Sequence, residues 1–143
     1  MNAIATRVVL ALLAFSSAVV GLWATLAPRS FYDEFPGGGR TWVSADGPYN
    51  EHLVRDVGEL NLALTVVTVF ALVVLTRTLV LAAALAWLVY SVPHLVYHLR
   101  HLAPFDGDDV VSIPVSLSLA VVGGVLLLLP PRERERDRDR QTV

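Results

Sequence analysis

Four long apolar segments constrain the fold of this chain more than any other feature of its sequence. They cover residues 8–27, 53–75, 79–99 and 110–129. Because a helix needs about 20 mostly apolar residues to cross a bilayer, each segment predicts one membrane span. The sequence therefore predicts an all-α fold, a four-helix transmembrane bundle within residues 1–131, in a multi-pass protein of the cell membrane that contacts the lipid bilayer.

The composition agrees with this fold and excludes several function classes. Hydrophobic residues make up 55% of the chain and charged residues 17%, whereas soluble domains are about 25% charged. The chain has no cysteine, which excludes disulfides and thiolate metal sites, and no lysine, which excludes Schiff-base chemistry and a P-loop. A formal net charge of −2 argues against nucleic acid as a partner.

Arginine placement predicts the orientation of the spans. Arg7 precedes the first span, Arg77 lies between the second and third, and five arginines follow the fourth. The positive-inside rule then predicts that both termini are cytoplasmic. Residues 132–143 alternate in charge and predict a disordered cytoplasmic tail. The first span could also be read as a cleaved signal peptide, but it exceeds the usual apolar signal core of about 7–15 residues.

Ionisable residues are rare inside membrane spans and often functional, and here they gather at the predicted extracytoplasmic ends of spans two and three. Two trios share a spacing of four and then three residues: His52, Asp56 and Glu59, and His94, His98 and His101. This spacing places each trio on one face of its helix. If the two helices are antiparallel around Arg77, the trios come level in three layers, Glu59 with His94, Asp56 with His98, and His52 with His101. We therefore predict two stripes that face each other.

Facing imidazoles and carboxylates suit a divalent metal, and helix bundles build metal sites from such inward residues. The predicted ligands are His52, Asp56, His94 and His98, with Glu59 and His101 as further candidates. Zinc is the predicted metal, and iron or copper are the alternatives. Two facing histidines could also hold haem, although the dense carboxylates make a haem pocket less suitable.

Three functions are compatible with this pattern. The first is a metal-binding protein that acts as an enzyme on a lipophilic small molecule. The second is a metal-free acid–base enzyme of lipids, with Glu59 as the candidate catalytic base beside His94. The third is a non-catalytic subunit of a larger membrane complex, or a homo-oligomer. A purely structural interpretation also stands, in which Glu51 pairs with Arg55 four residues later.

Two short segments carry a family resemblance. Gly-Pro-Tyr-Asn-Glu-His-Leu-Val-Arg-Asp-Val-Gly-Glu at residues 47–59, together with Pro-His-Leu-Val-Tyr-His-Leu at residues 93–99, resembles small four-span membrane proteins of actinobacteria. The resemblance covers spans two and three. It implies a source lineage, but it implies no activity, cofactor or site residue.

Overall fold

The computed structural model describes residues 1–130, so the predicted tail at 132–143 lies outside the described residues. The elements follow in the order α1 (Ala3–Leu26), α2 (Pro28–Glu34), β1 (Pro36–Gly37), β2 (Arg40–Thr41), α3 (Trp42–Asp46), α4 (Glu51–Val74), α5 (Arg77–Arg100) and α6 (Asp109–Leu128). Four of these helices, α1, α4, α5 and α6, are long and apolar enough to cross a membrane, with mean hydropathies of 2.0 to 2.3. The predicted all-α bundle of four spans is confirmed.

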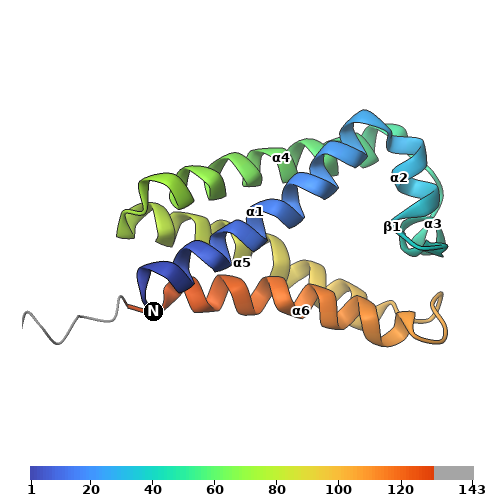
Figure 1. The fold of residues 1–143 in the computed structure, drawn as a ribbon. Helices are drawn as coiled ribbons and strands as arrows, with labels where there is room; N and C mark the ends of the chain where they lie inside the picture. The colour runs from blue at the N-terminus through green and yellow to red at the C-terminus, as the bar shows by residue number, and fades with distance from the viewer. Residues whose placement is uncertain (131–143) are drawn as a thin grey trace, which may run out of the picture.

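The outer surface of the bundle suits lipid. Large hydrophobic side chains are exposed on all four long helices, among them Phe15, Phe70, Val89 and Leu119. A soluble protein rarely exposes contiguous apolar surface on this scale. The chain is therefore a multi-pass membrane protein. Its two described ends, Met1 and Pro130, meet at one end of the bundle (Figure 1), where the Met1 amine donates to the Pro130 carbonyl. The side of the membrane on which they lie stays a prediction.

The local sequence explains where the spans begin. The side chains of Asn2, Asn50 and Thr76 each accept a hydrogen bond from a backbone N–H three residues later, the usual N-cap arrangement. Leu75, in a left-handed conformation, ends α4 directly before Thr76. The turn between α4 and α5 is therefore only two residues long, and these helices form a tight hairpin.

Helix α1 packs along α4, although the two are not neighbours in the chain. Two glycines permit this approach: a Cβ on Gly58 would lie 2.5 Å from Thr25 Oγ1, and one on Gly21 would lie 2.9 Å from Leu62. Ser17 and Thr65 share a hydrogen bond of 2.8 Å across the same interface. Small residues at helix contacts are typical of membrane bundles, where close packing rather than burial from water drives association. The bundle thus consists of an α1–α4 pair and an α5–α6 pair.

The two pairs join firmly at the end that holds Met1 and Pro130, here called the closed end. One core cluster there draws buried residues from all four helices: Leu10, Leu13, Ala71, Val80, Ala83, Ala84, Trp87 and Leu127. Arginines satisfy the helix carbonyls that have no partner within their own helix. Arg7 donates to the Leu72 carbonyl of α4, and Arg77 donates to three carbonyls at the end of α6.

At the opposite end, here called the loop-bearing end, the pairs diverge (Figure 1). The second core cluster, Ala24, Phe31 and Val54, joins only α1, α2 and α4. The loop from α2 to α3 reaches the other pair through polar contacts. Arg40 pairs with Asp109 at 2.8 Å, and Trp42 Nε1 donates to the same carboxylate at 2.8 Å.

Candidate functional site

Two of the predicted histidines occupy the inward face of α5. His94 and His98 continue the line of buried Ala84, Trp87 and Ser91 along this helix. Their Nε2 atoms lie 3.2 Å apart, so one imidazole donates a hydrogen bond to the other. His98 Nδ1 is buried and has no hydrogen-bond partner in the described part of the chain. A buried polar atom without a partner calls for an explanation such as a water, an ion or a ligand.

Both imidazoles line a cavity of about 470 Å³ between the two helix pairs. Ligand pockets are typically about 300–1,000 Å³, mostly apolar and equipped with a few convergent polar groups. The apolar walls come from all four long helices and from the loop, and include Val20, Phe31, Phe35, Trp42, Leu53, Val57, Trp87 and Ile113. The polar groups are serines, Asp46, Asn61, Tyr90 and the two histidines. This cavity has the composition of a site for a largely apolar molecule.

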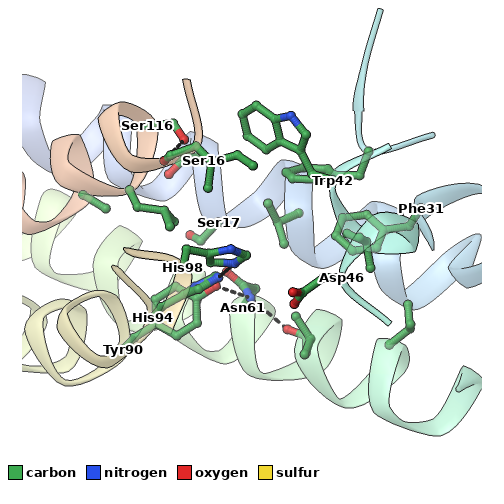
Figure 2. A pocket seen from close by; sticks show the side chains of 18 of the residues that line it. Ser16, Ser17, Phe31, Trp42, Asp46, Asn61, Tyr90, His94, His98 and Ser116 are labelled. Carbon is green, nitrogen blue, oxygen red and sulfur yellow. Dashed lines mark hydrogen bonds between the residues drawn. The ribbon is translucent and has the colours of Figure 1, made fainter. Parts of the chain in front are cut away.

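Asp46, at the end of α3, supplies the carboxylate of the cavity. It lines the same cavity as His94 and His98, without a direct hydrogen bond or ion pair to either imidazole within residues 1–130. Figure 2 shows Asp46 on the loop side of the cavity, across from the histidines on α5. Sequence reasoning did not single out this residue, because one acidic residue in a loop carries no spacing signal. Only the folding of the loop over the helix ends brings it to the histidines.

The wall of the cavity nearer the closed end is a short polar network. Asn61 Nδ2 donates to the Tyr90 hydroxyl at 3.4 Å and to the Val57 carbonyl at 2.8 Å (Figure 2). The Tyr90 ring meets the His94 ring edge to face at 5.5 Å. Asn61 and Tyr90 therefore form the wall against which the His94 ring packs.

From the sequence we expect Asn61, Thr65 and Thr68 to hydrogen-bond to span one or four. Thr65 does bond to Ser17 of α1, whereas Asn61 and Thr68 bond to Tyr90 and Trp87 of α5 instead.

The predicted stripe on α4 lies elsewhere. His52 and Asp56 form a pair of their own, with Nε2 and Oδ2 3.5 Å apart and side chains 83% and 44% exposed. Glu59 is also exposed, and none of the three lines the cavity. The reason is that α4 presents its opposite face, with Gly58 and Asn61, to α1 and α5. The assumption that the two stripes face each other does not hold in this structure.

His101 and Arg55 have local contacts. The His101 ring stacks on Tyr97, with centroids 4.2 Å apart, and is exposed. Arg55 pairs with Glu51 at 2.9 Å, as the structural interpretation predicted. Arg55 also donates to the Thr25 carbonyl of α1. Neither residue belongs to the cavity.

The structure thus brings together His94 and His98, and separately His52 and Asp56. Within residues 1–130, no three His, Asp or Glu side chains are arranged to hold a metal ion. Metal binding by the predicted residues accordingly stays a prediction, which elemental analysis addresses.

Comparison with known proteins identifies no family for the chain. No protein-family model, no curated protein and no solved structure matches it. The resemblance to actinobacterial four-span proteins therefore rests on its two motifs alone, and functional inference depends on the site.

Proposed function

We propose that this membrane protein binds a lipophilic small molecule in the cavity at its loop-bearing end and that His94 and His98 perform acid–base chemistry on it. The observation that carries the proposal is the pair of hydrogen-bonded imidazoles in an apolar cavity, with the Asp46 carboxylate across from them. This is the metal-free acid–base alternative, with the histidines in place of Glu59 as the proton-transfer groups. Glu59 lies outside the cavity and has no access to a ligand there.

The hydrogen bond between the two imidazoles gives them complementary roles in proton transfer. Of two imidazoles joined through Nε2 atoms, one donates and the other accepts, so the pair holds both a proton donor and a proton acceptor. A histidine pair can therefore remove a proton from one atom of a ligand and return it to another. A nearby carboxylate such as Asp46 stabilises the imidazolium formed between these steps.

A proton-transfer reaction such as an isomerisation suits this arrangement better than attack by a serine. Ser116 lines the cavity, but its hydroxyl donates to the Ile113 carbonyl and has no histidine partner. An activated serine nucleophile needs a base within hydrogen-bond reach. The reacting proton in this proposal accordingly belongs to the ligand and moves through the two imidazoles.

The test is a comparison of lipid profiles. The full-length protein in nanodiscs is incubated with a total lipid extract, and the mixture is analysed by liquid chromatography with untargeted mass spectrometry, which separates isomers of equal mass by retention time. We expect at least one lipid to be converted by the wild type and by His52→Gln, but not by His98→Gln or Asp46→Asn. Identical profiles for the wild type and His98→Gln would contradict the proposal.

A second candidate is metal binding centred on His94 and His98, supported by their i,i+4 spacing and by the partnerless His98 Nδ1. Two imidazoles suit zinc, iron or copper, and because no third His, Asp or Glu of residues 1–130 is placed to join them, water or a ligand atom would complete the coordination. Protein purified from metal-supplemented medium is analysed for bound elements. Metal that is lost in His98→Ala but kept in Asp56→Ala would support this site. Metal lost in Asp56→Ala would support the set predicted from the sequence, and only trace metal in the wild type would exclude both.

A further inference from the structure

We infer that the ligand of this cavity is a single-chain neutral lipid with a carbonyl head, whose α-proton the imidazoles can move, and that it enters sideways from the bilayer. A long-chain alcohol is its non-reacting analogue. The inference rests on the proposed function, because it names the class of molecule on which His94 and His98 act. Three observations carry it: the sides of the cavity, its covered end and its charge.

The first side opening lies between α1 and α6. Near the closed end these helices touch, since a Cβ on Gly123 would lie 3.1 Å from Leu13. Towards the loop-bearing end, Ser116 lies on the same face of α6 as the buried Ile113 and Leu127, yet it is exposed. Ser16, on α1, also lines the cavity and is exposed. The two helices therefore separate at the depth of the cavity.

A second side opening lies between α4 and α5. Their polar contacts run from Thr68 and Trp87, 2.9 Å apart, to Asn61 and Tyr90, and both Thr68 and Asn61 are buried. One turn further towards the loop-bearing end, Val57 lines the cavity and is 42% exposed. Because both openings fall within helices that cross the membrane, they face lipid tails rather than water.

The end of the cavity is covered by the loop between α1 and α4. Phe31, Phe35 and Trp42 from this loop line the cavity. Arg40 and Trp42 hold the loop to Asp109 at the start of α6, and Arg40 also donates to the Ser112 hydroxyl. A ligand that comes through the openings between the helices does not need to break these contacts, whereas one that comes from the aqueous side does.

The charge of the cavity selects the head of the ligand. Among residues 1–130, Asp46 is the only formally charged residue in the lining, and no arginine of this range belongs to it. Arg40, at the edge of the loop, is already paired with Asp109. A phosphate or carboxylate head would therefore meet no arginine and would face Asp46. The imidazole pair suits a neutral oxygen that accepts a hydrogen bond, as the oxygen of a carbonyl or a hydroxyl does.

The volume and shape favour one chain. A cavity of about 470 Å³ that opens sideways accommodates one hydrocarbon chain with a small head, and the rest of a longer chain can extend through the openings between the helices. Both α4 and α6 contribute apolar side chains to its lining, Leu53 and Val57 on α4 and Leu117 and Ala120 on α6.

The experiment uses three photoreactive probes with the same sixteen-carbon chain and diazirine position: an alcohol, a carboxylic acid and an amine. The full-length protein in nanodiscs is irradiated with each probe, and mass spectrometry maps the labelled residues. We expect the alcohol to label residues of the cavity, and excess unlabelled hexadecanol to suppress this labelling several-fold. Stronger labelling of the cavity by the acid or the amine would overturn the neutral head.

A matched pair of variants tests the route. Ser116→Trp narrows the opening between α1 and α6, whereas Ser118→Trp adds the same bulk on the same helix outside the cavity lining. We expect several-fold weaker cavity labelling in Ser116→Trp and unchanged labelling in Ser118→Trp. Equal labelling in both would overturn entry between α1 and α6. If Ser116→Trp fails to fold, the competition by hexadecanol in the wild type decides whether a chain occupies the cavity.

The result separates this inference from the proposed function. His98→Gln should abolish conversion of the lipid but leave labelling by the alcohol probe intact. Labelling without any conversion by the wild type would contradict the acid–base function and leave the ligand class standing. Conversion of a lipid by the wild type without labelling of the cavity would contradict the ligand class and leave the acid–base function standing.

Discussion

Two helices of this bundle carry ionisable residues at the same spacing, and the structure uses them differently. On α5, His94 and His98 face a cavity, bond to each other and lie near Asp46. On α4, His52 and Asp56 pair with each other on an exposed face. The comparison shows that equal spacing places residues on one face of a helix, but the neighbours of the helix decide what that face meets.

The neighbour that decides the orientation of α4 is α1. Gly58 and Gly21 let the two backbones come together, and Ser17 bonds to Thr65 in the same interface. Helix α4 thereby presents the face opposite to His52 and Glu59 to the rest of the bundle. Helix α5 has no comparable glycine contact with α4, and its polar face meets the cavity instead.

We expect the largest loss of stability at Gly58, in the contact between α1 and α4 that orients α4. In Gly58→Ala the new Cβ would lie 2.7 Å from the Thr25 backbone nitrogen, which cannot move aside as a side chain can. Overpacking costs about 1–3 kcal/mol, more than the gain of about 1 kcal/mol in helix propensity. We expect a lower thermal midpoint in detergent. Gly47→Ala is the matched control, because a Cβ there meets no atom within 4 Å. An equal loss in both variants would show that the α1–α4 contact does not orient α4.

A double-mutant cycle tests which carboxylate belongs to the histidines. The free energies of unfolding for His98→Gln and Asp46→Asn, alone and together, should reveal a coupling of about 0.5–3 kcal/mol, as for residues that share one cavity. The same cycle with His98→Gln and Asp56→Asn should be additive within about 0.5 kcal/mol, because these side chains belong to separate pairs. Coupling to Asp56 instead of Asp46 would restore the facing stripes predicted from the sequence.

We expect a smaller loss of stability when the contact between Asp109 and the loop that carries Asp46 is weakened. Asp109→Asn removes the charge that pairs with Arg40, and it should destabilise the loop by about 1 kcal/mol, since these side chains are partly exposed. Faster hydrogen exchange in residues 36–46 is the measurement. Asp33→Asn is the control, because its pair with Arg29 is local and more exposed. Unchanged exchange in Asp109→Asn would show that the contacts to α6 do not hold the loop.

The smallest effect is expected on the exposed stripe of α4. His52→Ala and Asp56→Ala should each change the free energy of unfolding by no more than about 0.5 kcal/mol, the usual worth of an exposed i,i+4 pair. Chemical denaturation in mixed micelles provides the measurement. A loss as large as that of Gly58→Ala would mean that a further partner covers this face in the membrane.

Local sequence was sufficient to predict the four spans, because the length and apolarity required of a spanning helix are properties of one segment. It also predicted that His94 and His98 share a face of their helix, since helical periodicity depends only on spacing. The rotation of α4 was decided by a contact between α1 and α4 that no segment contains. The place of Asp46 in the site likewise could not be predicted from the sequence, because a loop residue joins a site only when its loop docks on another helix. Here Arg40 and Trp42 dock the loop on Asp109. The sequence by itself determined which segments can cross the membrane. Tertiary packing decided which polar side chains meet inside the bundle, because the neighbours of a helix determine which of its faces is buried.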